Sequence, residues 1–415
     1  MYNIPVMMPY FDQDEAEEVS KVFASGWVAQ GAKVAEFERM VAAHEHVAHG
    51  VAVTSCTTAL HLALVTLGVN ANHDCILPSF TFTATPNAVL YTGATPIFAD
   101  VTMETYNLDP DGVERIIRER YDSDLINKET GKRLRTIIAV NLFGLCADLP
   151  RINAIAEQYG LSVLQDSACA FGAKIGETME ADFGNMSCLS FHPRKSITTG
   201  EGGMVLTNDE AQASHIKTLR SHGATVSEID RHKTAGYLMP DFNELGYNYR
   251  MTDIQAAVGI AQMRKMEFIT HTRRQKAAVY DRLIRDMGID FLRPPHVPAG
   301  YYHTYQSYVC VMDLERLGFR AGEIADIEQA SNLRNEIMGK LDELGIATRV
   351  GTHATHLLGH YKDRYGFAPE TYKVSYMLDK LSMTLPLYVQ MTEQDQIRVL
   401  QALMDVKTEL WGGNK

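Results

Sequence analysis

One lysine stands in a segment rich in threonine and glycine, where it could act as a covalent catalyst. Lys195 belongs to the segment Ser-Phe-His-Pro-Arg-Lys-Ser-Ile-Thr-Thr-Gly-Glu-Gly-Gly of residues 190–203. The amine of a lysine forms a Schiff base with a carbonyl group when burial or neighbouring cations lower its pKa. Arg194 and His192 stand close to Lys195 in the sequence and could supply such a field. A solvated loop lysine is the alternative, so the segment gains its meaning from the rest of the chain.

Two further polar clusters follow apolar runs with the length of buried strands. Asp166 ends the run Leu-Ser-Val-Leu-Gln, and Ser55-Cys56-Thr57-Thr58 follows Val-Ala-Val-Thr. A carboxylate at the end of a strand can pair with a cationic group of a ligand. The free amides in the first turn of a helix, together with two threonine hydroxyls, can bind a phosphate. Taken singly, each cluster is better explained as a helix cap.

Together these residues supply what pyridoxal phosphate needs from a protein. The cofactor takes a lysine for its aldehyde, a carboxylate for its pyridinium nitrogen and a cradle for its phosphate, and an aromatic ring can cover its face. Lys195, Asp166, Thr57 with Thr58, and Phe82 provide these groups after successive predicted strands. The combination therefore predicts a pyridoxal phosphate site.

The elements that must position these groups alternate along the first half of the chain. Continuously apolar runs alternate with helical patterns, which indicates a parallel sheet covered on both faces. The runs are residues 50–55, 75–79, 95–101, 136–142, 161–166, 186–191 and 202–208. Residues 252–287 are predicted to form one long helix that links two lobes, and residues 227–248 an irregular polar segment. We expect an α/β fold: a large cofactor-binding domain (1–255) with a mostly parallel sheet, and a smaller α+β C-terminal domain (256–415).

Composition excludes several classes of protein. The 415 residues suffice for two or three domains at ~150 residues each, and the formal net charge of −12 disfavours nucleic acid and anionic membranes as partners. Six cysteines without a C-x-x-C pair indicate reduced, cytoplasmic usage. Neither a signal peptide nor a membrane span is predicted. The histidines of 44–49 and of 353–360 have unsuitable or loose spacing for metal ligands, so no metal site is expected.

The ordered set of motifs resembles the DegT/DnrJ-type sugar aminotransferases, a branch of the aspartate-aminotransferase-like (fold type I) pyridoxal phosphate enzymes. The resemblance covers nearly the whole chain. It is carried by GWVAQGAKVAEFE, VTSCTTALHLAL, ILPSFTFTATPNAVLYTGATPIFADV, NLFG, QDSACAFGA, SFHPRKSITTGEGGMVLTND, LGYNYRMTDIQAAVG and LPLY.

The resemblance implies a role for each matched residue. Lys195 would bind the cofactor covalently and later carry the proton between cofactor and substrate. Asp166 would keep the pyridine nitrogen protonated, and Phe82 would stack on the ring. Thr57, Thr58 and Ser190 would bind the phosphate.

Other matched positions concern the second subunit, the substrate and the departures from the family. Asn248 would reach the phosphate of the neighbouring subunit, which implies a homodimer with shared active sites. Arg250 and His303 are candidates for substrate contact. Cys169 stands where the family often has Gln or His to bond the cofactor's ring oxygen, and a thiol is a poor substitute. Cys56 stands where many members have Gly, which should matter little where backbone amides bind the phosphate.

The expected activity is transfer of the amino group of L-glutamate to a keto-sugar, most simply a nucleotide-linked 4-keto or 3-keto deoxysugar. Two related alternatives stay open: an aminotransferase for a non-sugar cyclic ketone, and a cofactor-dependent sugar dehydratase on the same scaffold. The dehydratase branch characteristically has His in place of the catalytic lysine, so Lys195 argues against it. A non-catalytic regulator usually carries an added DNA-binding domain, for which this chain has no room.

Overall fold

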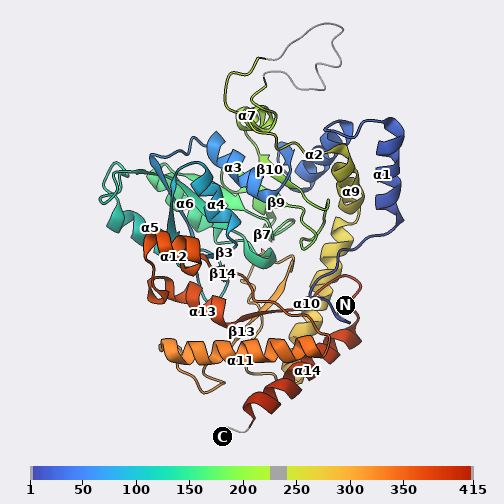
Figure 1. Ribbon diagram of the computed structural model, residues 1–415, viewed down its shortest axis with the longest axis vertical. Coiled ribbons are helices and arrows are strands. Elements are labelled where there is room, and N and C mark those ends of the chain that lie inside the picture. Colours follow the sequence, from blue (N-terminus) through green and yellow to red (C-terminus); the bar gives the residue numbers. More distant parts are fainter. Residues whose placement is uncertain (1–2, 225–240, 413–415) are drawn as a thin grey trace.

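The computed structural model describes residues 3–224 and 241–412, so most of the predicted polar segment 227–248 lies outside the described residues. Its larger lobe is built on a seven-stranded sheet of order β1-β10-β9-β6-β5-β2-β4 (Figure 1). The strands are β1 (His49–Val53), β2 (His73–Pro78), β4 (Thr95–Ala99), β5 (Arg133–Val140), β6 (Ser162–Asp166), β9 (Met186–Ser190) and β10 (Gly203–Thr207). Neighbouring strands are parallel except at β10, which is antiparallel to both β1 and β9. The mostly parallel sheet predicted from the apolar runs is confirmed.

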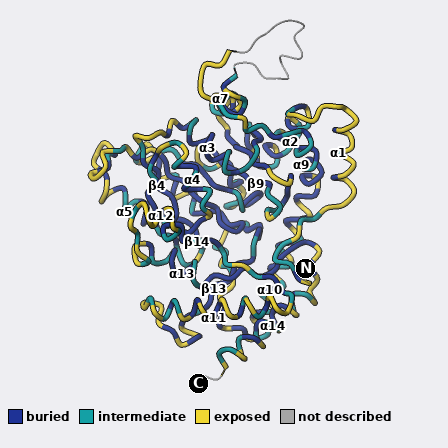
Figure 2. Tube along the Cα trace, viewed as in Figure 1, coloured by how far each residue is buried: buried dark blue, intermediate teal, exposed yellow. Residues whose placement is uncertain are grey.

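Helices cover both faces of this sheet, as the apolar strands require. Val51 and Val53 pack with α3, α4 and α7, whereas Ala52 between them packs with α2 and α9 on the opposite face. Figure 2 shows the strands buried between helices whose outer surfaces are exposed. The helices of this lobe are α1 (Gln13–Ser25), α2 (Ala32–His44), α3 (Cys56–Thr66), α4 (Ala84–Tyr91), α5 (Pro110–Arg120), α6 (Leu149–Tyr159), α7 (Glu210–Arg220) and α9 (Asp253–Met263).

The smaller lobe surrounds a three-stranded antiparallel sheet of order β11-β13-β15. One apolar core joins this sheet to α10, α11, α13 and α14, and it includes Ile4 from the N-terminal segment. The elements are α10 (Met266–Asp286), β11 (Leu292–Arg293), β13 (Tyr308–Met312), α11 (Ile324–Glu343), α13 (Lys373–Leu381), β15 (Ser382–Leu385) and α14 (Glu393–Trp411). The short helix α12 (Gly359–Tyr365) instead packs on the larger lobe, where its Tyr361 contacts Phe98 of β4.

The single helix predicted for residues 252–287 is wrong: α9 ends at Met263 and α10 begins at Met266. The break has no glycine or proline to announce it. Lys265, at the break, is buried and donates to both carboxylate oxygens of Glu15 on α1 at 2.8 and 2.9 Å. Tertiary ion pairing therefore outweighs the local helical pattern. The domain boundary at 255/256 stays a prediction, and it falls within α9, which packs against α1 and α2.

Two small sheets connect the two lobes. β14 (His353–Ala354) pairs with β3 (Phe80–Thr81), and β12 (Tyr301–Tyr302) pairs with β7 (Lys174–Ile175), which in turn pairs with β8 (Thr178–Met179). Each joins a segment near the predicted cofactor residues to the C-terminal part of the chain. In the described part of the chain, no helix is long and apolar enough to cross a membrane.

Candidate active site

Asp166 ends β6 and is buried there among polar partners from other elements. Its Oδ2 accepts a hydrogen bond from the hydroxyl of Thr85 at 2.7 Å, and its Oδ1 accepts one from the amide of Ala168 at 3.2 Å. The Cys56 thiol lies 3.9 Å from Oδ1. Burial raises the pKa of Asp166 above its ordinary value, although the bonds from Thr85 and Ala168 and the charge of Lys195 act in the opposite direction. The ionised carboxylate is therefore costly unless a further cation meets it.

Lys195 lies in the loop after β9, the strand that runs parallel to β6 beside it. Its ammonium is 3.2 Å from the Sγ of Cys169, three residues after Asp166. Because the two strands end at the same edge of the sheet, the lysine and the carboxylate come together although 29 residues separate them in the sequence. This juxtaposition is the one that the strand pattern predicts.

The electrostatic surroundings of Lys195 differ from the expectation that Arg194 and His192 lower its pKa. Burial lowers the pKa of Lys195, but Cys169, Cys56 and Asp166 outweigh it, so that the pKa is raised. The pKa of His192 is itself lowered by burial. The amine of Lys195 is thus a charged hydrogen-bond donor to Cys169. A carbonyl group that reacts with this amine must displace that contact.

The first turn of α3 lies against the edge of this cluster. Ser55 caps the helix: its Oγ accepts from the amide of Thr58, whose hydroxyl donates to the Ser55 carbonyl at 2.8 Å. A Cβ on Gly203 of β10 would come within 2.4 Å of the Ser55 carbonyl carbon. Glycine at 203 thus allows β10 to pass directly under the start of α3. Thr57 is half-buried in the same turn.

The other predicted cofactor contacts lie around this turn. Ser190 is the last residue of β9 and pairs with Gly203. Phe82 follows β3, with 63% of its surface exposed, so its ring is available for stacking. Asn248 is exposed, and Arg250 pairs with Val53 at the end of β1 that leads into Ser55. Their predicted roles stay predictions, since among the described residues none of these side chains forms a hydrogen bond with Lys195 or Asp166.

His303 is placed differently from the other candidates. It is 2% exposed, its Nδ1 accepts from the amide of Tyr305 at 2.8 Å, and its ring stacks on that of Tyr305 at 3.9 Å. Burial, with a smaller effect of Arg274, lowers its pKa to about 3. The structure therefore shows a neutral interior histidine that supports the 303–306 turn. Gln306 of that turn donates to the carbonyl of Arg194, next to Lys195, at 2.6 Å.

Sequence reasoning missed Thr85, although it lies in the motif that supplied Phe82. We expect Thr85→Val to raise the pKa of Asp166 further, because the carboxylate loses a donor. The acid limb of the rate profile should move to higher pH by about one unit or more, since a hydrogen bond to a charged group contributes ~1.5–3 kcal/mol. The measurement is kcat/KM from pH 5 to 9, with Thr85→Ser expected to restore the wild-type limb. Thr92→Val, the same change at the end of α4, is the control; an unshifted Thr85→Val profile contradicts the assignment.

The buried side chain of Glu180 contacts the turn that follows Asp166. Its carboxylate accepts from the hydroxyls of Ser167 at 2.6 Å and Ser187 at 3.0 Å. Burial, and the nearby Glu45, raise the pKa of Glu180 well above its ordinary value. Nothing in the spacing around residue 180 announces this, because its partners come from β6 and β9.

We expect Glu180→Gln to change how stability depends on pH. The unfolded carboxyl titrates near ~4.3, so above that pH the unfolded state loses its proton first and wild-type stability falls. The amide does not titrate, so the unfolding free energy of the variant relative to wild type should rise between pH 5 and 8, by on the order of 1 kcal/mol. Urea unfolding at several pH values measures this. Parallel stability curves for the two proteins would contradict it, and Glu157→Gln on exposed α6 is the matched control.

These groups fit pyridoxal phosphate. An amine that can become covalently bound, a buried carboxylate that lacks a full counter-charge, and a helix start approached by a glycine strand correspond to the aldehyde, ring nitrogen and phosphate of that cofactor. When bound, the cofactor acts as an electron sink for the substrate carbon. Lys195 would hold it and move a proton at its Nζ, and Asp166 would hold its ring nitrogen protonated. By contrast, the described residues form no group of His, Cys, Asp and Glu suited to a metal ion.

The fold and these residues together define a pyridoxal phosphate-dependent aminotransferase. The model of the DegT/DnrJ/EryC1/StrS aminotransferase family matches residues 9–404, and the chain belongs to this family. It is therefore an aminotransferase of a family that acts on sugars.

The chain is similar to related proteins over nearly their whole length. The chain is 32% identical to GDP-perosamine synthase of Caulobacter vibrioides, over 97% of this chain and 98% of that protein. It is 30% identical to the spore coat polysaccharide biosynthesis protein SpsC of Bacillus subtilis, over 97% of each chain. The structure of Spr1654 from Streptococcus pneumoniae, described as a sugar aminotransferase in its PMP form, has the same fold, with a TM-score of 0.86, 24% identity, and coverage of 98% and 100% of the two chains.

Proposed function

We propose that this aminotransferase moves the amino group of L-glutamate to a nucleotide-linked keto-deoxysugar. The observation that carries the proposal is the placement of Lys195 and Asp166 at the ends of adjoining strands β9 and β6, in a chain that matches the family from residue 9 to residue 404. The similarity to a protein named for the synthesis of a GDP-linked aminosugar supports the nucleotide-linked acceptor. A ring carbon at position 4 or 3 is the proposed acceptor.

The residue roles in this proposal follow from position. Lys195 attaches the cofactor and moves the proton, and Asp166 keeps the ring nitrogen charged. The start of α3 with Thr57 and Thr58, together with Ser190, binds the phosphate. Phe82 covers the ring, Cys169 positions the amine of Lys195, and Arg250 faces the substrate. His303 acts only through the turn that it supports.

The visible absorption spectrum of the cofactor-loaded protein tests the activity. Addition of L-glutamate should convert the yellow form to the colourless amine form, and an accepted keto-sugar should restore the colour. Restoration by nucleotide-linked keto-sugars, but not by free cyclic ketones, supports the proposed substrate class. Restoration by an inosose-type ketone alone would favour the non-sugar alternative. A yellow protein that ignores glutamate contradicts the donor.

The exposed positions of Asn248 and Phe82 support a homodimer in which each active site takes residues from both chains. We expect Asn248→Asp to remove activity, because it would place a carboxylate next to the phosphate of the other subunit's cofactor. Mixing inactive Lys195→Ala and Asn248→Asp proteins should restore about a quarter of wild-type activity, since a mixed dimer carries one intact site and half of the dimers are mixed. Sites confined to one chain give no recovery, provided that light scattering shows subunit exchange.

A further inference from the structure

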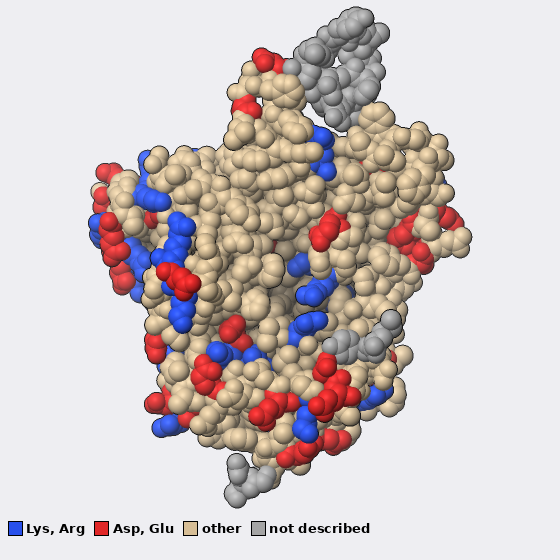
Figure 3. Space-filling view, in the orientation of Figure 1, with Lys and Arg blue, Asp and Glu red and all other residues tan. Residues whose placement is uncertain are grey.

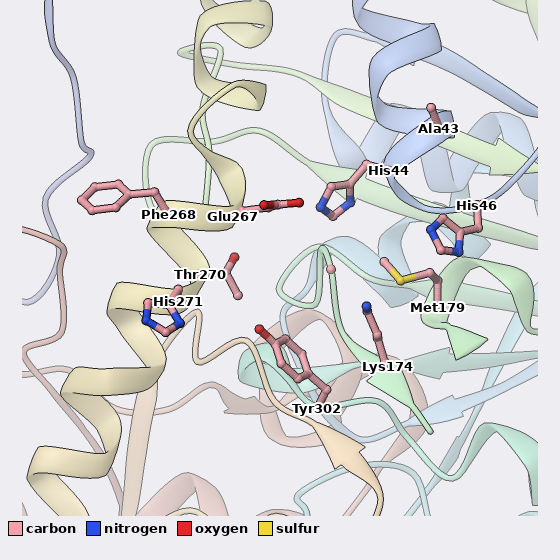
Figure 4. Close-up of a pocket in the computed structure, with 11 residues that line it drawn as sticks. Ala43, His44, His46, Lys174, Met179, Glu267, Phe268, Thr270, His271 and Tyr302 are labelled. Carbon is pink, nitrogen blue, oxygen red and sulfur yellow. The ribbon is translucent and has the colours of Figure 1, made fainter. Parts of the chain in front are cut away.

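A cavity with a volume of about 730 Å³ lies beside β7 and is lined by none of the residues assigned to the active site. Figure 4 shows side chains from three parts of the chain directed into it: the end of α2, the β7–β12 pair, and the start of α10. A cavity of this size accommodates a small organic ligand, for which ~300–1,000 Å³ is usual. On the face of the molecule drawn in Figure 3, several Lys and Arg side chains lie near the centre.

Two opposite charges face this cavity without meeting each other. Lys174 begins β7, and Glu267 lies in the first turn of α10. Among the described residues, no ion pair or side-chain hydrogen bond is formed by either group, and the Lys174 ammonium has only a 5.8 Å approach to the Tyr302 ring. In Figure 4 both side chains point toward the centre of the cavity. A ligand that carries both an anionic and a cationic group would satisfy both.

The side of the cavity around Lys174 favours an anion with several oxygen atoms. The guanidinium of Arg274, which does not itself line the cavity, lies 3.8 Å from the centroid of the Tyr302 ring, so that two cations approach this ring. His44 and His46 add imidazole nitrogens to the lining of the cavity. The Nδ1 of His44 lies 2.9 Å from Glu45 Oε1, so its Nε2 can donate to a phosphate when both ring nitrogens carry a proton. Cationic and imidazole nitrogens in one wall suit a phosphate.

The side around Glu267 favours an amine. Its carboxylate is the one acidic group among the lining residues. Thr270 and His271 on the next turn of α10 offer further hydrogen-bonding groups, which suit the hydroxyls of a sugar. Phosphate at one end, amine at the other and hydroxyls between them describe one class of molecule.

We propose that this cavity binds a sugar phosphate that carries an amino group. This proposal rests on the proposed function in one respect: the product of that reaction is also a phosphate-bearing sugar with an amino group. The phosphate is placed against Lys174 and His44, and the ammonium against Glu267. The site is separate from that of Lys195, although Gly172 in its wall follows Cys169 by three residues.

Calorimetry on the cofactor-loaded, full-length protein tests this with glucosamine 6-phosphate as the probe. Glucose 6-phosphate lacks the amine, and glucosamine lacks the phosphate. We expect the probe to bind about five- to tenfold more tightly than either compound, because each lacks one ionic contact. Equal affinities for the three compounds, or no binding of the probe, would overturn the proposal.

Two variants locate the binding. Lys174→Ala should weaken both phosphates about five- to tenfold and leave glucosamine unchanged. Glu267→Gln should weaken the amine-bearing compounds and leave glucose 6-phosphate unchanged. Lys217→Ala and Glu157→Gln, on exposed positions of α7 and α6, are the matched controls. Unchanged binding in both cavity variants means that the probe occupies another site, and this overturns the proposal.

The visible spectrum separates this proposal from the proposed function. Binding in the cavity should persist in Lys195→Ala, and the probe should leave the cofactor absorption of wild type unchanged. A protein that does not transaminate but still discriminates the three compounds through Lys174 and Glu267 would contradict the proposed function alone. A protein that transaminates a keto-sugar but shows no such discrimination would contradict the cavity proposal alone.

Discussion

Replacing Lys195 by alanine should lower transamination by about 10⁴-fold or more. The same amine would attach the cofactor and move the substrate proton, and proton transfer by a positioned group alone contributes ~10²–10⁴-fold. The variant should still bind the cofactor through Asp166 and the start of α3, but without the absorption of the covalent form. Single-turnover formation of the amine form of the cofactor on adding L-glutamate, together with cofactor content, measures both effects.

Two comparisons separate the chemistry of Lys195 from its charge. Lys195→Arg keeps a cation near Cys169 and Asp166 but cannot form the covalent bond, so we expect it to be as inactive as Lys195→Ala. Small primary amines added to Lys195→Ala should recover part of the rate, because they can take over proton transfer in the space that the side chain leaves. Lys217→Ala on exposed α7 should behave as wild type. A Lys195→Ala protein with normal turnover would remove the basis of the assignment.

The sequence could predict Lys195 and Asp166 because both depend on a simple rule. Buried parallel strands appear as apolar runs, and the residues after them share one edge of the sheet. The structure places Asp166 at the end of β6, and Lys195 in the loop that follows the neighbouring strand β9. Neither position depends on fine packing.

Residues whose role depends on packing could not be predicted in this way. Thr85 reaches Asp166 from the first turn of α4, and Glu180 reaches Ser167 from a short turn after β8. A histidine can form hydrogen bonds with a substrate, and the sequence predicts this role for His303. In the structure, however, its Nδ1 is buried and accepts a hydrogen bond from the backbone amide of Tyr305. The break between α9 and α10 likewise depends on Lys265 pairing with α1. In each case a contact between residues distant in the sequence determines the residue's role or the end of the helix, and the local sequence pattern does not indicate that contact.

Asp166→Asn should give the second largest loss, with an opposite effect on stability. The amide cannot hold a positive charge on the cofactor's ring nitrogen, and breaking a buried ion pair costs ~3–5 kcal/mol, which corresponds to about 10²–10⁴-fold in rate. The variant should bind the cofactor more weakly, and a higher cofactor concentration should not restore its activity. Single-turnover kinetics at saturating cofactor measures the loss, and Asp209→Asn at the cap of α7 is the control.

The stability of the cofactor-free protein distinguishes this role from a structural one. Burial raises the pKa of Asp166 above its unfolded value, so at neutral pH its charge opposes folding, and this opposition increases as pH rises through the interval between the two pKa values. Asp166→Asn removes that cost, so the cofactor-free variant should unfold at the same temperature as wild type or higher at pH 8. The difference should shrink toward pH 4. A variant that loses both activity and stability would show that Asp166 supports the fold, whereas lost activity with retained or higher stability is the signature of a carboxylate kept charged for its cofactor.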